Sequence, residues 1–537
     1  MPTLDWIGKS KVVNHHLDVP YKTLERQYSF DKDGEHKEDN GSENMIIHGD
    51  NLEALKSLLP QYEGRIKCIY IDPPYNTGNE KWVYNDNVND PKIRKWLGTV
   101  VGQEGEDLSR HDKWLCMMYP RLKLLQKLLS NDGAIFISID DNEQANLKLI
   151  CNEIFGKNNY QGCIVRSTGQ TTGQDSSGLG SSFDYIYVYS KKSVYQFGGL
   201  PLTEHDLKRF KDKDEKGYYA YDQLRKTGSQ DRREDRPNMY YPVEAPDGTK
   251  VYPIAPAGYE GRWRMEESTY RKNENEGLVL WKKTKRDGQL IWWPYIKYYA
   301  EGRTKRPSPL WTEIEGNKKA SRDVRAIFGR NDVFDYPKPI EMIERIISIA
   351  NVKENDMVLD SFSGTGTTAH AVLNMNKQDG GNRKFILIEM MDYADSITAE
   401  RVKRVINGYG EGKKAVEGTG GDFCYYELGE PIFNGEMLNE AIGEDEIRKY
   451  AYFTETKQRL EPRKADEPYY LGKYVDNAYY FYYEKEQITT LNNDFLNTIQ
   501  TAAGAYVIYA DLCTLSDSEL EKYNITFKKI PRDITKL

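Results

Sequence analysis

The sequence predicts an α/β protein whose strand–helix alternation is interrupted once by an inserted domain. Short apolar runs rich in β-branched residues alternate with longer amphipathic segments. A glycine-rich turn follows one of these runs at 361–366. Between about 195 and 335 the alternation gives way to a basic, aromatic stretch punctuated by proline and glycine. The first two observations favour a parallel sheet with helices on its faces, and the third favours an insertion.

Before the insertion, the pattern predicts three strands and two helices. The predicted strands are 66–71, 134–139 and 185–190, and the predicted helices are 114–129 and 143–155. Two polar segments, the charged 30–43 and the Gly/Ser-rich 167–182, are predicted to be loops.

Alternation resumes after the insertion. A helix is expected over 339–350, strands over 357–360 and 384–389, and a helix over 394–407. From about 411 the chain is acidic and rich in tyrosine, with strands expected over 505–510 and 525–530. The predicted organisation is therefore a first α/β half, an inserted domain, a second α/β half and an α+β C-terminal domain. These four parts are 1–195, 196–335, 336–410 and 411–537.

The composition is that of an ordinary globular protein. Of 537 residues, 38% are hydrophobic and 29% are charged. No apolar run approaches the roughly 18 residues that cross a bilayer, and the first residues lack the apolar core of a signal peptide, so a cytoplasmic location is expected. The six cysteines form no CxxC pair, which argues against a zinc site and against a disulfide framework. No metal is expected.

The net charge of −8 hides a strong asymmetry. Residues 201–330 contain 28 Lys and Arg against 21 Asp and Glu, and five of the nine tryptophans fall between 263 and 311. Basic residues interleaved with aromatics suit a polyanion that offers flat faces for stacking. A solvated face over an aromatic core explains the same composition equally well.

The first motif that carries chemistry is "IYIDPPYNTG", residues 69–78. Asp72 stands at the end of a predicted buried strand, and Pro73 and Pro74 stiffen the following turn because each fixes φ and lacks an N–H. Asp72 and a proline carbonyl would present two acceptors beside the flat ring of Tyr75. Two acceptors and a ring match an exocyclic amine on a planar base; the alternative is a turn stiffened only for structural reasons.

The second motif is "VLDSFSGTGTTAHAV", residues 358–372, a strand–turn–helix unit of the nucleotide-binding kind. Gly364 and Gly366 allow the backbone to approach a ligand closely, and Glu389 ends the next strand, where a ribose-binding carboxylate belongs. A dinucleotide is the plain alternative. However, Asp360 precedes the turn, which suits a ligand with a cationic amino group, and this favours S-adenosylmethionine.

With both motifs in this order, the chain resembles the β-class DNA amino-methyltransferases, most closely the modification (Mod) subunits of type III restriction-modification systems. In that class "DPPY" precedes "FxGxG", and a target-recognition domain lies between them. Further matches are "WIGK" (6–9), "HGDNLEAL" (48–55), "GAIFISIDDNE" (133–143), "YPKP" (336–339) and "GGNRKFILIE" (380–389). Ser361 and Ser363 depart from the family, which more often has bulkier or apolar residues there.

The resemblance implies a Rossmann-like, S-adenosylmethionine-dependent methyltransferase fold with an inserted target-recognition domain and a smaller C-terminal domain. It implies methyl transfer to N6 of an adenine that is flipped out of duplex DNA, with the C-terminal region serving for homodimerisation or for docking a restriction subunit. The implied catalytic residues are Asp72, Pro73, Pro74 and Tyr75. The implied cofactor-binding residues are Asp50, Lys338, Asp360, Phe362, Gly364, Gly366, Thr367 and Glu389.

Several alternatives stay open at this point. Lys338 could equally be an exposed loop lysine, and Asp50 could cap the following helix, with Asn51 as a rival cap. A cytosine-N4 enzyme and a solitary adenine methyltransferase are the closest alternatives in function. More distant ones are a dinucleotide-dependent oxidoreductase, a non-catalytic DNA-binding module and a methyltransferase acting on RNA or protein. No Pro-Cys dipeptide provides the nucleophile of a cytosine-C5 enzyme, and no GxxxxGK[ST] motif provides a helicase, so restriction would need another subunit.

Overall fold

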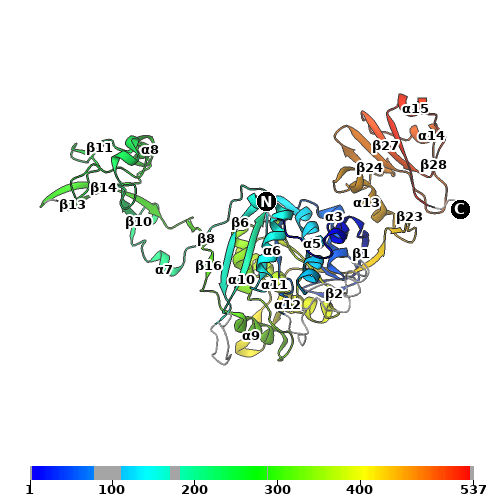
Figure 1. Ribbon diagram of the computed structural model, residues 1–537, viewed down its shortest axis with the longest axis horizontal. Coiled ribbons are helices and arrows are strands. Elements are labelled where there is room, and N and C mark those ends of the chain that lie inside the picture. The colour runs from blue at the N-terminus through cyan, green and yellow to red at the C-terminus, as the bar shows by residue number, and fades with distance from the viewer. Residues whose placement is uncertain (1–2, 78–109, 170–181, 287, 533–537) are drawn as a thin grey trace. The chain divides into compact units, whose positions relative to one another are not determined.

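The computed structural model describes residues 3–77, 110–169, 182–286 and 288–532 (Figure 1). The chain divides into two compact units: the larger runs up to Gly198 and again from Ser308 onward, and the smaller is Gly199–Pro307. Within the described ranges, no helix is both long enough and apolar enough to cross a membrane.

A mixed 11-stranded sheet forms the centre of the larger unit, in the order β16-β6-β7-β5-β4-β17-β18-β3-β21-β1-β2. The strands from β5 through β21 run parallel, and β7 and β1 continue the sheet antiparallel on either side. The predicted α/β class is confirmed. In sheet order the strands are Leu310–Trp311, Tyr160–Ser167, Phe183–Ser190, Leu129–Ile139, Ile66–Ile71, Met357–Asp360, Lys384–Glu389, Met45–His48, Phe423–Pro431, Lys22–Asp31 and Gly34–His36.

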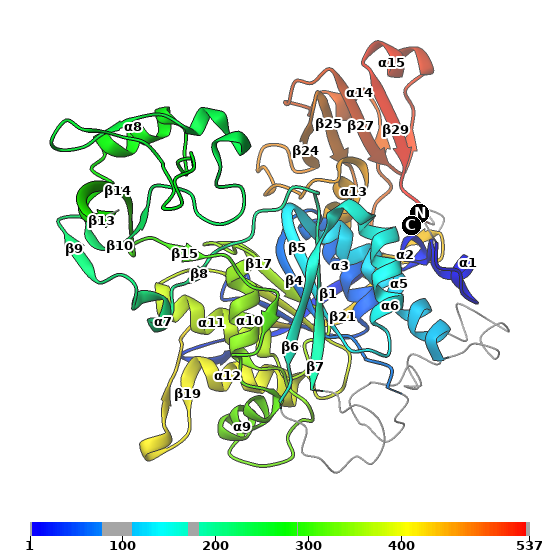
Figure 2. The ribbon, with the colours of Figure 1, turned by 60° about the vertical axis from the view of Figure 1, so that its left-hand side comes forward.

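Two sets of helices cover the sheet, and Figure 2 shows them on opposite sides of the strands. One set is α3 (Asn51–Tyr62), α5 (Arg110–Leu128) and α6 (Gln144–Cys151); the other is α10 (Ile340–Ile349), α11 (Thr367–Asp379) and α12 (Glu400–Asn407). Successive side chains of each strand point to opposite faces of the sheet, so each strand contributes apolar residues to the packing under both sets of helices. Ile69 and Ile71 of β4, for example, pack with Leu55 of α3 and Leu122 of α5.

Segment 30–43, predicted to be a loop, instead completes β1 and forms β2. The two strands pair through Phe30 and Glu35 around a tight turn in which Gly34 has φ 113°. Asp33-Gly34 is a dipeptide typical of a hairpin turn. The segment was nevertheless predicted to be a loop, because these strands lie at the edge of the sheet and are polar. A second difference is β21, which lies between β3 and β1 although its residues come after 411.

The remaining C-terminal residues form a four-stranded sheet of their own, in the order β24-β25-β27-β29. Its strands are Tyr470–Tyr474, Asn477–Phe481, Ala505–Ala510 and Ile525–Lys529. Helix α13 (Glu444–Thr456) packs on this sheet and also against α3 of the main domain. Tyr450 of α13 also packs against Tyr21, which directly precedes β1, with ring centroids 5.0 Å apart.

The smaller unit is built on a sheet of order β13-β14-β10-β9 with helix α8 (Glu267–Asn275) beside it. The strands are Val279–Arg286, Gln289–Tyr299, Gly217–Gln223 and Asp212–Asp214. Trp263, Tyr270 and Trp293 form its buried core. The unit ends at Pro307, so β16 and α9 (Asn317–Phe328), which lie inside the predicted range 196–335, belong to the larger unit.

Candidate active site

Three neighbouring strands of the large sheet lead to acidic residues at one edge. Asp72 follows β4 directly, Asp360 ends β17 and Glu389 ends β18. Strand β17 lies between β4 and β18 and is parallel to both. The carboxyl ends of parallel strands meet at one edge, where α/β proteins bind their ligands. The fold therefore joins the two motifs that an insertion separates in the sequence.

The turn after β4 is held by helix α5. Buried Trp114 donates a hydrogen bond from Nε1 to the carbonyl oxygen of Pro74 at 2.7 Å. Asn76 then takes a left-handed conformation with φ 59°, which asparagine tolerates better than most residues. The Pro74 carbonyl is thus engaged within the fold.

Glu143 fixes the end of this turn, a role that the sequence analysis missed. Its fully buried carboxylate accepts a hydrogen bond from Asn76 Nδ2 through Oε1 and one from Asn146 Nδ2 through Oε2, the latter at 2.8 Å. The ring Nδ1 of His111 lies 2.7 Å from Oε1. A buried carboxylate needs such donors. The available signal was the acidic run 140–143 after β5, which places a carboxylate beside the site.

Asp72 pairs with Lys338, which precedes α10. Lys338 Nζ donates to Asp72 Oδ2, and the two side chains are only 9% and 16% exposed. Asp72 Oδ1 is buried and accepts no hydrogen bond from a described residue. The Lys338 ammonium also lies 5.0 Å from the ring centroid of Tyr75. Lys338, expected at the cofactor, therefore contacts two of the predicted catalytic residues.

Asp360 is buried beneath the glycine-rich turn. Its Oδ1 accepts from the Phe362 backbone N–H at 3.1 Å, and its Oδ2 accepts from the Thr368 hydroxyl at 2.6 Å. Burial raises the pKa of Asp360 to about 7, although these hydrogen bonds oppose the rise. Burial disfavours the charged form of Asp360, and a cationic ligand beside it would stabilise that form.

Glu389 closes the other side of the turn. Its Oε2 accepts from the Gly364 N–H at 2.8 Å and its Oε1 from the Met391 N–H at 3.1 Å. Burial raises the pKa of Glu389 to about 7 as well. The carboxylate links the turn after β17 to the end of β18.

The turn itself requires glycine at two positions. Gly364 and Gly366 have φ 50° and 77°, in the left-handed region that favours glycine. A Cβ on Gly366 would also lie 3.3 Å from Cγ2 and from the carbonyl oxygen of Thr398. The Thr398 hydroxyl in turn donates to the Gly364 carbonyl at 2.5 Å. The backbone of the turn is held in one shape by these contacts.

Arg401 of α12 is a further part of the site that the sequence did not reveal. Its guanidinium is buried and donates to the hydroxyls of Thr365 at 2.5 Å and Thr367 at 2.9 Å. It forms no ion pair with any residue that the structure describes, and burial lowers its pKa to about 10. An arginine on an amphipathic helix predicts a surface position, so no local signal pointed to this contact.

The other expected cofactor residues lie at the same edge. Asp50 caps α3 by accepting from the Leu52 N–H at 2.8 Å and the Glu53 N–H at 3.3 Å, which agrees with the capping interpretation. Phe362 is half-buried against the core, and the Thr367 hydroxyl is turned toward Arg401. Thr367 thus links the turn to Arg401 of α12.

Three buried polar atoms near the glycine-rich turn have no hydrogen-bond partner among the described residues. The hydroxyls of Ser361 and Ser363 and Oδ1 of Asp72 are buried, and none of them bonds to a described residue. Buried polar groups normally have partners. Together with the left-handed glycines, they fit a ligand rich in hydroxyl and amino groups, bound between Asp360 and Glu389 and reaching toward Asp72.

Residues 66–400 match the family model described as DNA methylase (N6/N4). The type III restriction-modification enzyme EcoPI Mod subunit of Escherichia phage P1 is 34% identical over 419 residues, which is 72% of this chain and 63% of that protein. The type II methyltransferase M.KpnI of Klebsiella pneumoniae is 36% identical over 360 residues, which is 64% of this chain and 80% of that protein. The chain thus spans 63% of the length of the EcoPI subunit and 58% of the StyLTI Mod subunit of Salmonella typhimurium. These matches confirm the resemblance drawn from the motifs.

Proposed function

Because the chain belongs to the DNA methylase family, we propose that it transfers a methyl group from S-adenosylmethionine to N6 of an adenine in duplex DNA. The observation that carries this proposal is the meeting of Asp72, at the end of β4, with Asp360 and Glu389 at the ends of β17 and β18. One strand end provides acceptors for an amine, and the next two provide carboxylates for a cationic nucleoside.

The nucleophile is activated mainly by its position. An adenine amine is a poor nucleophile because its lone pair is delocalised into the ring. Hydrogen bonds from its two N–H groups to Asp72 Oδ1 and to the Pro73 carbonyl favour an sp³-like nitrogen whose lone pair faces the methyl donor. The carboxyl group of Asp72 also stabilises the positive charge that develops on that nitrogen.

Tyr75 gives the target base a flat face. The amine lies inside the duplex, so the base has to leave the stack before it reaches Asp72. The half-buried ring of Tyr75 packs against the main core and is therefore fixed in place. Stacking on this ring holds the flipped adenine while Asp72 orients its amine.

The methyl donor is S-adenosylmethionine, which supplies an electrophilic methyl group on its sulfonium. Asp360 would hold its ammonium group, and Glu389 would accept from its ribose hydroxyls. Gly364 and Gly366 bring the backbone close to it, while Phe362 and Thr367 complete the turn. Asp50 supports this edge through the start of α3.

The type of enzyme system to which the protein belongs is proposed from its similarity to known relatives. We propose a modification subunit of a type III system, acting on cytoplasmic DNA as a homodimer together with a separate restriction subunit. The similarity to EcoPI and StyLTI Mod subunits supports it. The similarity to M.KpnI supports the alternative of an enzyme outside a type III system.

The test is nucleoside analysis of duplex DNA incubated with the purified protein and S-adenosylmethionine. N6-methyl-2′-deoxyadenosine should form with the native protein and should be absent with Asp72→Ala, whose cofactor affinity should stay within a few-fold of native. N4-methylcytosine would replace the adenine assignment with the cytosine-N4 one, and no methylated base at all would overturn the proposal. Co-purification of a helicase-nuclease from the native cell decides between the type III assignment and its alternative.

A further inference from the structure

The ribbon formed by β13 and β14 carries lysines with two different surroundings. The strands are antiparallel and pair Lys282 with Trp293, Lys283 with Trp292 and Lys285 with Leu290. Residues opposite each other in such a ladder share a face of the sheet. Trp293 is 3% exposed in the core of the smaller unit, and Leu290 is 70% exposed. One face of the ribbon is therefore turned inward and the other outward.

Lys282 is engaged within the unit. Its ammonium lies 3.6 Å from the ring centroid of Tyr221 on β10, a cation–π contact at close range. The Lys282 side chain is also half-buried. Its ammonium group therefore already has a partner within the unit.

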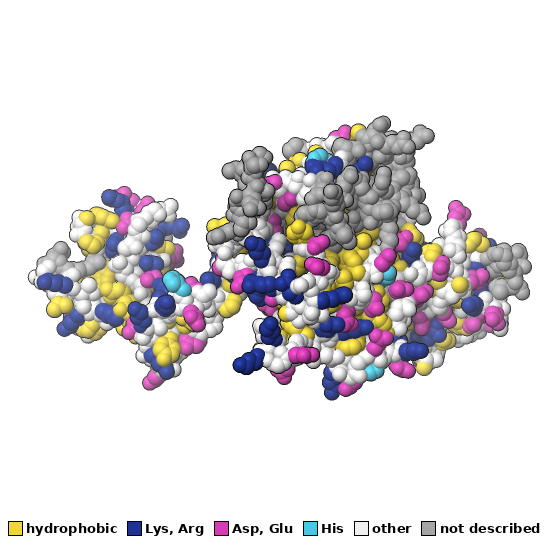
Figure 3. Space-filling view, turned by 90° about the horizontal axis from the view of Figure 1, so that it is seen from below, with side chains coloured by type: hydrophobic (Ala, Val, Ile, Leu, Met, Phe, Trp, Pro, Cys, Tyr) yellow, Lys and Arg dark blue, Asp and Glu magenta, His cyan; other side chains and the backbone are white. Residues whose placement is uncertain are grey.

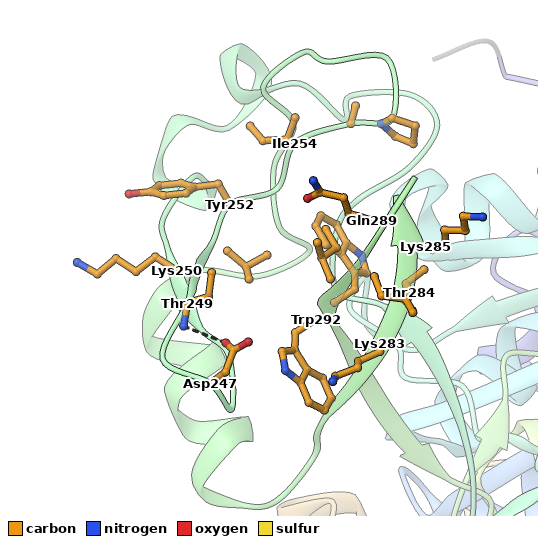
Figure 4. Close-up of a pocket in the computed structure, with 16 residues that line it drawn as sticks. Asp247, Thr249, Lys250, Tyr252, Ile254, Lys283, Thr284, Lys285, Gln289 and Trp292 are labelled. Atoms are coloured by element: carbon orange, nitrogen blue, oxygen red, sulfur yellow. Dashed lines mark hydrogen bonds between the residues drawn. The ribbon is translucent and has the colours of Figure 1, made fainter. Parts of the chain in front are cut away.

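Lys283 and Lys285 lie on a groove of about 810 Å³ between the ribbon and the segment 247–256, which includes β12 (Lys250–Val251) (Figure 4). Both side chains are exposed, and neither forms an ion pair with a described residue. The same is true of Lys250 on the opposite wall. Of the described residues that line the groove, Asp247 alone is acidic, and it accepts a hydrogen bond from the Thr249 N–H at 3.1 Å.

Aromatic rings accompany these cations. The Lys283 ammonium lies 5.2 Å from the ring of Trp292, and Tyr252, 38% exposed, lies on the other wall. Figure 3 shows lysine and arginine side chains spread over the visible face of the smaller unit, beside hydrophobic ones. Residues 199–307 contain 23 Lys and Arg against 18 Asp and Glu, whereas the whole chain has a net charge of −8. The surroundings of the groove are thus complementary to an anion with apolar parts.

We propose that this groove binds the sugar-phosphate backbone of duplex DNA, that Lys283 and Lys285 each pair with a phosphate, and that Lys282 does not. A two-stranded ribbon fits the major groove of DNA, and lysines along its outer face reach the flanking phosphates. Trp292 and Leu290 form the apolar part of the contact, against the sugars. The inference rests on the proposed function for its substrate, and it adds which surface and which cations hold that substrate.

The experiment compares matched substitutions in the full-length protein. Lys283→Gln/Lys285→Gln should weaken binding to duplexes of any sequence and should lower the slope of log K against log salt by about 1.8, because each lost phosphate contact removes about 0.9. Lys282→Gln, one residue away, should leave the slope unchanged and lower the melting temperature of the protein. Lys283→Arg/Lys285→Arg should restore the native slope.

Two results would overturn the inference: equal slopes for the native protein and the Lys283/Lys285 variant, or a slope that falls as much with Lys282→Gln. Stronger binding of single-stranded than of duplex DNA, lost in the same variant, would also replace duplex DNA as the ligand. A failure of the proposed function is distinguishable because it leaves the salt slope intact while no methylated base forms. Methylation by the Lys283/Lys285 variant should recover at saturating DNA, since its catalytic residues are native.

Discussion

Lys338 donates a hydrogen bond from Nζ to Oδ2 of Asp72, and its ammonium faces the ring of Tyr75 at 5.0 Å. One oxygen of Asp72 is thereby paired with a cation, and the other, Oδ1, stays buried without a bond to a described residue. Both residues also act on a second buried acid, Asp360, whose pKa Lys338 lowers and Asp72 raises. Lys338 thus contacts the part of the site that we propose to bind the target base.

Lys338→Met should therefore lower turnover more than cofactor affinity. Without the ammonium group, Asp72 loses the donor that holds Oδ2, and its carboxylate is no longer fixed in one orientation. We expect kcat to fall by roughly 10-fold or more, because misplacing a group at the reacting centre by about 1 Å can cost about 100-fold in rate. The measurement is kcat together with the dissociation constant of S-adenosylmethionine, with Lys338→Arg as the variant that keeps the charge. A large loss of S-adenosylmethionine affinity with an unchanged kcat would instead assign Lys338 to the cofactor.

Tyr75→Phe should keep most of the activity, and Tyr75→Ala should lose roughly 10-fold or more, because stacking of a base on an aromatic ring contributes about 1–3 kcal/mol. Burial raises the pKa of the Tyr75 hydroxyl well above its ordinary value, so the phenol stays neutral and is not expected to act as a base. Fluorescence of 2-aminopurine at the target position measures capture of the flipped base. If Phe were as damaging as Ala, the hydroxyl would carry the role.

Arg401→Met should lower cofactor affinity by about 10-fold while leaving the melting temperature equal or higher. The arginine orders the glycine-rich turn through Thr365 and Thr367, but its burial without an ion pair to a described residue is costly, and an apolar side chain of similar size removes that cost. Calorimetric titration with S-adenosylmethionine and thermal melting separate the two effects. A variant that loses stability and affinity in parallel would show Arg401 to be a packing residue only.

Asp360→Asn should stabilise the protein at high pH. Burial raises the folded-state pKa of Asp360 to about 7 from its ordinary 3.8, so the folded protein binds more protons than the unfolded chain between these values. Stability is therefore lost as the pH rises through this window and is constant above it. The gain from Asn should be about 1 kcal/mol or less near pH 4.5 and on the order of 4 kcal/mol at pH 8, because one unit of pKa shift corresponds to about 1.4 kcal/mol. Melting at the two pH values measures it, with exposed Asp33→Asn as the control; an equal gain at both would contradict the assignment.

The sequence predicted the parts of the site whose chemistry is local. Asp72 and Asp360 stand at the ends of β4 and β17, where short apolar runs placed them, because burial on both faces leaves a strand with a plain apolar pattern. The contacts around these residues could not be predicted in the same way. Lys338 was expected in the site from its family motif, but its pairing with Asp72 was not. Glu143 and Arg401 reach the site through the packing of separate elements, which residue type and spacing do not encode.

The start of the C-terminal domain could not be predicted from composition either. Strand β21 (Phe423–Pro431) lies in the main sheet between β3 and β1, but its sequence shares the tyrosine-rich composition of the residues that follow it. A boundary near 411, drawn from composition, therefore separates a strand from its own sheet.

Two truncations should consequently behave differently. A chain ending at Gly410 lacks β21, so β3 and β1 lose their shared neighbour, and it should fail to fold. A chain ending at Asn434 keeps β21 and loses the four-stranded sheet with α13, which uncovers Tyr21 where Tyr450 packed. It should retain S-adenosylmethionine binding, melt at a lower temperature and change its oligomeric state or its binding of a partner subunit. Calorimetric titration and light scattering measure these properties, and a 434-residue chain with the same assembly as the full protein would place the subunit interface elsewhere.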